Sequence, residues 1–179
     1  MPNSLPSPLL VRKLRHHSLL NPDRAISIQA ATLRDIPEIL GLEQPVATAA
    51  HWSQHQYEQS IQSTGEASGR LVLVARQAIE LHTGILGFLV ARHISPEWEL
   101  ENIVVASTHQ RQGIGRRLLE AMIQNARETK SATVFLEVRV SNTAARKLYE
   151  SAGFTETGRR KSYYSGPSED AILYRLDPN

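Results

Sequence analysis

The stretch "QRQGIGRRLL", Gln110–Leu119, places two glycines one residue apart among three arginines. From Ile114 onward the apolar residues recur on one helical face, which predicts that a helix begins there. The start of a helix leaves backbone N–H groups unpaired and carries a partial positive charge. Gly113 and Gly115 remove the Cβ atoms that would keep an anion away, and the arginines add cationic donors. The stretch therefore predicts a turn that binds a pyrophosphate.

Two common phosphate-binding motifs do not fit this turn. A nucleotide-triphosphate loop needs G-x-x-x-x-G-K-[ST], and the stretch has no such pair of lysine and hydroxyl residues. A dinucleotide-binding turn needs G-x-G-x-x-G, and Leu118 stands where its third glycine belongs. The pattern present is Q-x-x-G-x-G. Taken by itself, it leaves open the alternative of a solvated basic helix start with a tight turn.

The residues around this turn predict an alternation of strands and helices. Thr32 and Asp35 form a capping-box pattern before one helix, Ser53 precedes a weaker helix, and Asn142 precedes a short third one that Gly153 ends. Period-2 patterns and β-branched runs predict strands at 26–30, 71–76, 84–92, 97–105 and 132–140, with two more after 153. The predicted order is β-α-α-β-β-β-α-β-α-β-β. The strands at 97–105 and 132–140, joined through a helix, are expected to be parallel.

Composition limits the class of protein. The 179 residues are 41% hydrophobic and 21% charged, an ordinary balance for one globular domain. No apolar run reaches the roughly 18 residues of a membrane-spanning helix, so no membrane partner is expected. The chain has no cysteine, which excludes disulfides, thiolate metal sites and a cysteine nucleophile. A cytoplasmic protein is the expectation.

The charge of the chain is unevenly distributed. Residues 1–25 hold four basic side chains and one acidic one, which leaves 16 basic and 17 acidic side chains in residues 26–179. The prolines and serines of 1–25 predict a flexible basic extension, and residues 26–179 are predicted to form the folded domain. Because that domain is not basic, no specific nucleic-acid partner is expected.

Three segments together carry a resemblance to a known family. "IQAATLRDIPEI", the Q-x-x-G-x-G turn after a strand, and "SNTAARKLYESAGF" one strand later resemble the GNAT N-acetyltransferase superfamily over residues 26–179. The resemblance implies an α/β (α+β) fold with a mixed, mostly antiparallel sheet of six to seven strands, two splayed parallel central strands and four helices. It also implies acetyl-CoA as co-substrate. No metal is expected, because His51 and His55 stand four residues apart without an evident third ligand. The seven histidines as a whole show no ligand spacing.

The resemblance is closer to one branch of that superfamily. "HWSQHQYEQSI", "LEVRVSNTAARKLYESAGF", "RRKSYY" and "EDAI" look like the bacterial ribosomal-protein-alanine N-acetyltransferases, the RimI-like group. This implies transfer of an acetyl group to the α-amine of a protein or peptide N-terminus, ribosomal proteins included. The segments around Trp52 and Tyr163–Tyr164 would then flank the acceptor. A small-molecule amine acetyltransferase of the same fold and a non-catalytic acyl-CoA-binding module are the alternatives.

The resemblance also implies which residues hold the cofactor. The backbone of one strand would pair with the pantetheine arm, through Ile103, Val104 and Val105. The glycine turn would wrap the pyrophosphate, through Arg111, Gln112, Gly113, Ile114, Gly115 and Arg116. Asn142 would touch the cofactor beyond the point where the two parallel strands splay.

Two residues are expected to carry out the chemistry. Glu137 lies in an apolar strand, where a carboxylate is costly unless it is paired or functional, and Arg139 on the same face is the obvious ion-pair partner. The resemblance instead places Glu137 at the general-base position. Tyr149 would by default be a core tyrosine, whereas the resemblance makes its hydroxyl the general acid at the cofactor sulfur.

Two further glutamates are alternative bases. Strand alternation places Glu99 and Glu101 on one face together with Glu97. Other branches of the superfamily place a glutamate on this strand, so either Glu99 or Glu101 could share the role. A solvated or substrate-facing acidic row is the competing interpretation of the same pattern.

Overall fold

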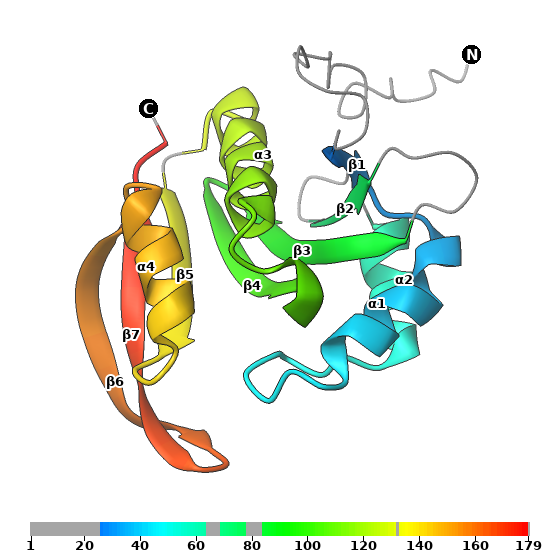
Figure 1. Ribbon diagram of the computed structural model, residues 1–179. Helices are drawn as coiled ribbons and strands as arrows, with labels where there is room; N and C mark the ends of the chain where they lie inside the picture. The colour runs from blue at the N-terminus through cyan, green and yellow to red at the C-terminus, as the bar shows by residue number, and fades with distance from the viewer. Residues whose placement is uncertain (1–25, 64–68, 78–83, 132, 179) are drawn as a thin grey trace.

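The computed structural model describes residues 26–63, 69–77, 84–131 and 133–178, and the predicted extension at 1–25 lies outside them. Within those residues seven strands form one sheet in the order β1-β2-β3-β4-β5-β7-β6 (Figure 1). All neighbouring strands are antiparallel except β4 and β5, which are parallel. The predicted order of strands and helices, and the mixed sheet with a central parallel pair, are confirmed.

The elements lie close to their predicted bounds. The strands are β1 (Ile26–Ala30), β2 (Arg70–Gln77), β3 (Ile85–Ile94), β4 (Glu97–Val105), β5 (Thr133–Arg139), β6 (Thr155–Ser165) and β7 (Ser168–Leu176). The α-helices of the described residues are α1 (Ile36–Glu43), α2 (Gln54–Gln62), α3 (Ile114–Glu128) and α4 (Thr143–Ser151). Short 3-10 turns at Leu33–Asp35 and Ser107–His109 precede α1 and the glycine turn.

Side-chain caps mark where α2 and α4 begin. The Ser53 hydroxyl accepts a hydrogen bond from the Gln56 backbone N–H at 3.3 Å, and the Gln56 side chain accepts one from Ser53 N at 2.8 Å. Asn142 Oδ1 accepts from the Ala145 N–H at 3.2 Å in the same way at the start of α4. These bonds satisfy backbone donors that a helix start leaves unpaired, as the sequence predicted. None of the described helices has the length and apolar content needed to cross a membrane.

The sheet separates two apolar cores. α3 and α4 pack on one face, where the predicted stripe of α3 is buried through Ile114, Leu118, Leu119, Met122, Ile123 and Ala126. α1 and α2 pack on the other face. Strand β2 supplies both cores alternately, with Leu71 and Leu73 on one side and Val72 and Val74 on the other. Because both faces are covered, β2 and β3 are apolar along most of their length.

The parallel pair β4–β5 comes apart halfway along its length. The two strands pair from Glu97 with Thr133 to Leu100 with Leu136, and no pairing follows although both strands continue. On the other side of β4, Ala91 faces Leu100 and Val90 faces Asn102, so Glu101 is an extra residue in a β-bulge. A bulge bends a strand and increases its twist. Beyond it β4 and β5 diverge (Figure 1), which gives the two splayed central strands that the family resemblance implied.

We expect Leu118→Ala to destabilise the domain by about 2–5 kcal/mol, because Leu118 is fully buried between α3 and the sheet. Leu33→Ala removes the same atoms from a side chain that is 48% exposed, and should change stability by no more than about 0.5 kcal/mol. Urea unfolding of both variants measures the difference. Equal losses would contradict the burial of Leu118 between α3 and the sheet.

Candidate active site

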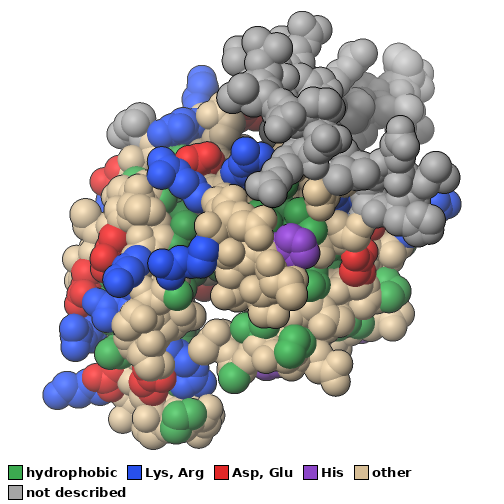
Figure 2. Space-filling view, in the orientation of Figure 1, with side chains coloured by type: hydrophobic (Ala, Val, Ile, Leu, Met, Phe, Trp, Pro, Cys, Tyr) green, Lys and Arg blue, Asp and Glu red, His purple; other side chains and the backbone are tan. Residues whose placement is uncertain are grey.

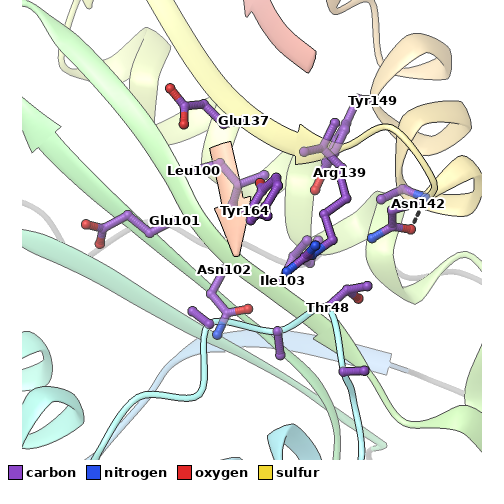
Figure 3. A pocket seen from close by; sticks show the side chains of 15 residues that line it. Thr48, Leu100, Glu101, Asn102, Ile103, Glu137, Arg139, Asn142, Tyr149 and Tyr164 are labelled. Carbon is purple, nitrogen blue, oxygen red and sulfur yellow. Dashed lines mark hydrogen bonds between the residues drawn. The ribbon is translucent and has the colours of Figure 1, made fainter. Parts of the chain in front are cut away.

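A pocket opens where β4 and β5 separate (Figure 3). Its volume is about 330 Å³. Its walls come from β4, β5, the start of α4, the loop 47–50 after α1, and the β6–β7 hairpin. The predicted site residues Ile103, Glu137, Asn142 and Tyr149 all line it. Segments far apart in the sequence therefore place their polar groups around one cavity.

Glu137 reaches this pocket from β5, and its side chain is 17% exposed. Its Oε1 atom lies 2.9 Å from Nη1 of Arg160, a residue of the neighbouring hairpin. The Tyr163 hydroxyl also bonds to the Glu137 carboxylate, and this hydrogen bond raises the pKa of Tyr163. The base expected from the sequence thus has two partners, both from β6.

The predicted alternative, an ion pair between Glu137 and Arg139, is wrong. Arg139 instead lies 3.3 Å from Oε2 of Glu169, and its guanidinium stacks 4.1 Å from the centre of the Tyr164 ring. Glu169 also accepts the Ser141 backbone N–H, which lowers the pKa of Glu169. The β6–β7 hairpin folds across the end of β5, so each charge on β5 finds a partner from the hairpin rather than from its own strand.

Tyr149 is both a core residue and a pocket residue. Its side chain is 5% exposed, and its ring packs beside Phe154 and Tyr174 at centroid distances of 6.0 and 6.2 Å. Figure 3 shows its hydroxyl directed into the pocket. Burial raises the pKa of this hydroxyl, which keeps it protonated above the usual tyrosine range. The two interpretations of Tyr149 from the sequence are therefore compatible.

Glu99 and Glu101 are ion-paired rather than forming a solvated row. Both oxygens of Glu101 accept hydrogen bonds from Arg70, at 2.7 and 3.0 Å, and this bonding raises the pKa of Arg70. Glu99 accepts one from Arg92 at 2.9 Å. Glu101 lines the pocket, but a carboxylate held by a two-point arginine contact is a poor choice for a proton acceptor. Glu137 is the better candidate.

Gly113 and Gly115 are required by different features of the structure. Gly113 precedes α3 with a φ of 81°, a left-handed conformation that glycine adopts without strain, and open space surrounds the position of a Cβ atom. Gly115 is packed instead, because a Cβ there would lie 3.2 Å from a methyl group of Leu148 on α4. Gly113 thus leaves the helix start open, as predicted, whereas Gly115 lets α3 and α4 approach.

The remaining residues of the turn leave its backbone accessible. The first hydrogen bond of α3 runs from Arg117 N to Gly113 O, so the preceding N–H groups have no helical partner. Arg111, Gln112 and Arg116 are exposed, and Arg116 is 2.8 Å from Glu120. Figure 2 shows Lys and Arg side chains gathered over the face that carries α3 and α4. An anion would meet both backbone donors and basic side chains here.

The part of β4 that was predicted to bind the pantetheine arm has one free edge, at the point where β4 and β5 separate. Ile103, Val104 and Val105 follow the last pairing of β4 with β5, so the edge of β4 that faces β5 has no strand partner there among the described residues. They remain paired with β3 on the other edge. Val105 O accepts a bond from Gln110 at 3.2 Å, which ties the end of β4 to the glycine turn.

Several residues at the pocket were given no role on the basis of the sequence. Asn102 on β4, Arg160 on β6 and the loop 47–50 all border the pocket or its polar groups. Asn102 stands out as a lone amide before the apolar run "IVV", and Arg160 lies in the "RRKSYY" segment that resembles the family, but the loop 47–50 carries no such signal. Among the described residues no group of three His, Asp or Glu side chains is arranged to hold a metal ion.

Two comparisons with curated proteins identify relatives. The [Ribosomal protein bS18]-alanine N-acetyltransferase of Escherichia coli (strain K12) is 45% identical over 91 residues, which span 50% of this chain and 62% of that protein. The protein of the same name from Salmonella typhimurium is 37% identical over 153 residues, or 84% of this chain and 95% of that protein. The first alignment thus covers less than two thirds of its relative, whereas the second covers nearly all of it.

The solved structures and a family profile point the same way. The crystal structure of the ribosomal-protein-S18-alanine N-acetyltransferase from Escherichia coli superposes with a TM-score of 0.71 at 33% identity, covering 87% of this chain and 95% of that one. The profile described as "Acetyltransferase (GNAT) family" matches residues 33–154. That match includes the splayed strands and the glycine turn. The chain therefore belongs to the acetyltransferase (GNAT) family.

Proposed function

We propose that this protein is an acetyl-CoA-dependent N-acetyltransferase that acts on the N-terminal α-amine of a protein, by direct attack in a ternary complex. The observation that carries the proposal is one pocket at the β4–β5 splay that contains both Glu137 and Tyr149. Relatives named for acetylation of the ribosomal protein bS18 support the choice of a protein N-terminus, with a ribosomal protein as acceptor.

The residues of this chain fit the cofactor in two places. The free edge of β4 at Ile103–Val105 offers backbone groups to the amides of a pantetheine arm, as an added strand would. The turn at Arg111–Arg116 offers the N–H groups of a helix start to a pyrophosphate, and Asn142 borders the pocket beyond the splay. Acetyl-CoA would supply the acetyl group as a reactive thioester.

Glu137 is assigned the role of the proton acceptor. An α-ammonium group has a pKa of about 7.7–8.0, so near neutral pH it must lose a proton before it can attack a carbonyl carbon. The Arg160 partner of Glu137 is 54% exposed, and ion pairs at such exposure are weak. An incoming ammonium can therefore replace Arg160 at the Glu137 carboxylate and transfer its proton there.

Tyr149 is assigned the role of the proton donor. Its hydroxyl faces the same pocket, and the raised pKa keeps the hydroxyl protonated at any physiological pH. As the new C–N bond forms and the C–S bond breaks, the departing sulfur takes up a proton. The Tyr149 hydroxyl supplies that proton, which avoids the release of a free thiolate.

The experiment that tests the proposal compares acceptors. The purified protein is incubated with acetyl-CoA and either an alanine-initiated peptide, a polyamine or an aminoglycoside, and free thiol and product mass are measured. We expect acetylation of the peptide at its α-amine. Acetylation of the small amines alone would favour a small-molecule acetyltransferase, and turnover of none of them would leave an acyl-CoA-binding module.

We expect Gly113→Ala to weaken the binding of coenzyme A, because alanine disfavours the left-handed conformation by about 1 kcal/mol and places a methyl group at the anion site. Gly158→Ala is the matched control, since a Cβ there also meets open space but lies on β6. Calorimetric titration with coenzyme A measures both. Equal affinities in the two variants would remove Gly113 from the cofactor site.

Tyr149→Phe should keep its ring packing and lower turnover by about 10²–10⁴-fold, the range for loss of a general acid. Tyr174→Phe, a neighbouring buried ring outside the pocket lining, should retain turnover. Because burial raises the Tyr149 pKa, the parent enzyme should lose no activity from tyrosine deprotonation as the pH rises to about 10. Full turnover in Tyr149→Phe would show that water supplies the proton.

Glu137→Gln should lose turnover at neutral pH, and the loss should shrink above the α-amine pKa of roughly 8, because the acceptor then arrives deprotonated. The measurement is turnover against pH for both proteins with a saturating N-terminal peptide and saturating acetyl-CoA. A lysine acceptor, with a pKa near 10.4, should show little such rescue over the same range. Parallel pH profiles for the parent and the variant would argue against Glu137 as the base.

A further inference from the structure

Glu43, the last residue of α1, is a carboxylate buried on the face of the sheet opposite α3 and is only 1% exposed. Four donors surround it. Its Oε1 accepts from His51 N at 2.7 Å and from Asn102 Nδ2 at 2.7 Å. Its Oε2 accepts from Trp52 N at 3.1 Å and from the Tyr57 hydroxyl at 2.9 Å. A buried carboxylate is tolerated when its lone pairs are satisfied in this way.

Through these four bonds the end of α1, the loop after it and α2 are joined to strand β4 of the sheet. His51 and Trp52 end the loop whose residues 47–50 line the pocket, and Asn102 lines the pocket from β4. Tyr57 belongs to α2 and is fully buried. The mechanism assigned to Glu137 and Tyr149 makes no use of this network.

Glu43 also decides how the Asn102 amide is turned. A carboxylate only accepts hydrogen bonds, so the group of Asn102 that faces Glu43 has to be its NH₂. The carbonyl oxygen Oδ1 must then face elsewhere, and among the described residues it has no hydrogen-bond partner. Figure 3 shows this oxygen directed toward the space bounded by Ile103 and Thr48.

We propose that Asn102 Oδ1 is a binding point for the amino group of the acceptor, and that Glu43 is the positioning residue that keeps this oxygen turned into the pocket. The inference rests on the proposed function, which supplies an amine. An ammonium carries only N–H donors. Of the two carboxylates in the pocket, Glu101 is held by Arg70, and Glu137 has first to exchange its contact with Arg160. Asn102 Oδ1 is an acceptor that no cation of the described residues engages.

The test uses two peptides that differ in a single group. One is an alanine-initiated peptide with a free α-amine, and the other has hydrogen in place of that amine. Both carry a dye at the carboxyl end, and their affinities are measured by fluorescence anisotropy with coenzyme A bound to the protein. Acetylation of the first peptide by the parent protein, scored separately, tests the proposed function and not this inference.

We expect the parent to bind the free-amine peptide more tightly than the other peptide. Asn102→Leu should lower this ratio of affinities about 10-fold, which corresponds to the loss of one hydrogen bond to a charged group. Glu43→Gln replaces an acceptor-only group with one that fits either orientation of the Asn102 amide, so it should lower the preference by a smaller factor. In the Asn102→Leu background, Glu43→Gln should lower it no further. Tyr57→Phe also removes a bond to Glu43 but keeps the carboxylate, and should retain the preference.

A preference that survives in Asn102→Leu would overturn the proposal, as would an equal affinity of the parent for both peptides. A loss in Tyr57→Phe as large as that in Asn102→Leu would also overturn it, because general loosening of the network would then explain the effect. If Asn102→Leu does not fold, Asn102→Ala removes the same oxygen with a smaller side chain. The ratio of its affinities for the two peptides is then compared with that of the parent.

Discussion

The pairing of β4 with β5 ends at Leu100 and Leu136, and the arrangement of the site depends on that ending. The bulge at Glu101 bends β4 away while β3 continues to hold its other edge. The same divergence frees the backbone of Ile103–Val105 and opens the cavity between the strands. Without it, β4 and β5 would continue as an ordinary parallel pair, and neither the free edge of β4 nor the pocket between the strands would exist.

The charges around the pocket are balanced by partners from other elements. Glu101 is held by Arg70, Glu137 by Arg160, and Arg139 by Glu169. The arginine partners of the two glutamates differ in solvent exposure, and this determines how readily each ion pair can be exchanged. Arg160 is 54% exposed, so its contact can exchange with an incoming cation, whereas the two-point Arg70–Glu101 contact is the more enclosed one. The pocket thus keeps one carboxylate available for chemistry.

The side of the pocket formed by the loop 47–50 and Asn102 depends on a buried polar group, the Glu43 carboxylate. Glu43 connects the end of α1, the loop to α2, α2 itself and β4 through four hydrogen bonds. Because every donor is satisfied by the same carboxylate, the loop 47–50 and the Asn102 amide take up their positions together. In the proposed enzyme, the Glu43 carboxylate therefore takes part both in the packing of α1 and α2 and in the orientation of the Asn102 amide.

The sequence by itself determined the order of the elements and the place of the glycine turn, because helical and strand periodicities, caps such as Ser53 and Asn142, and the pattern around Gly113 are local. It also selected Glu137 and Tyr149, through a resemblance to a family. Only the tertiary structure decided the partners of these groups. Glu137 pairs with Arg160 rather than Arg139, and Glu43 meets Asn102, because the β6–β7 hairpin and α1 approach across the sheet. Contacts between residues far apart in the chain depend on how strands register and splay, which no local pattern encodes.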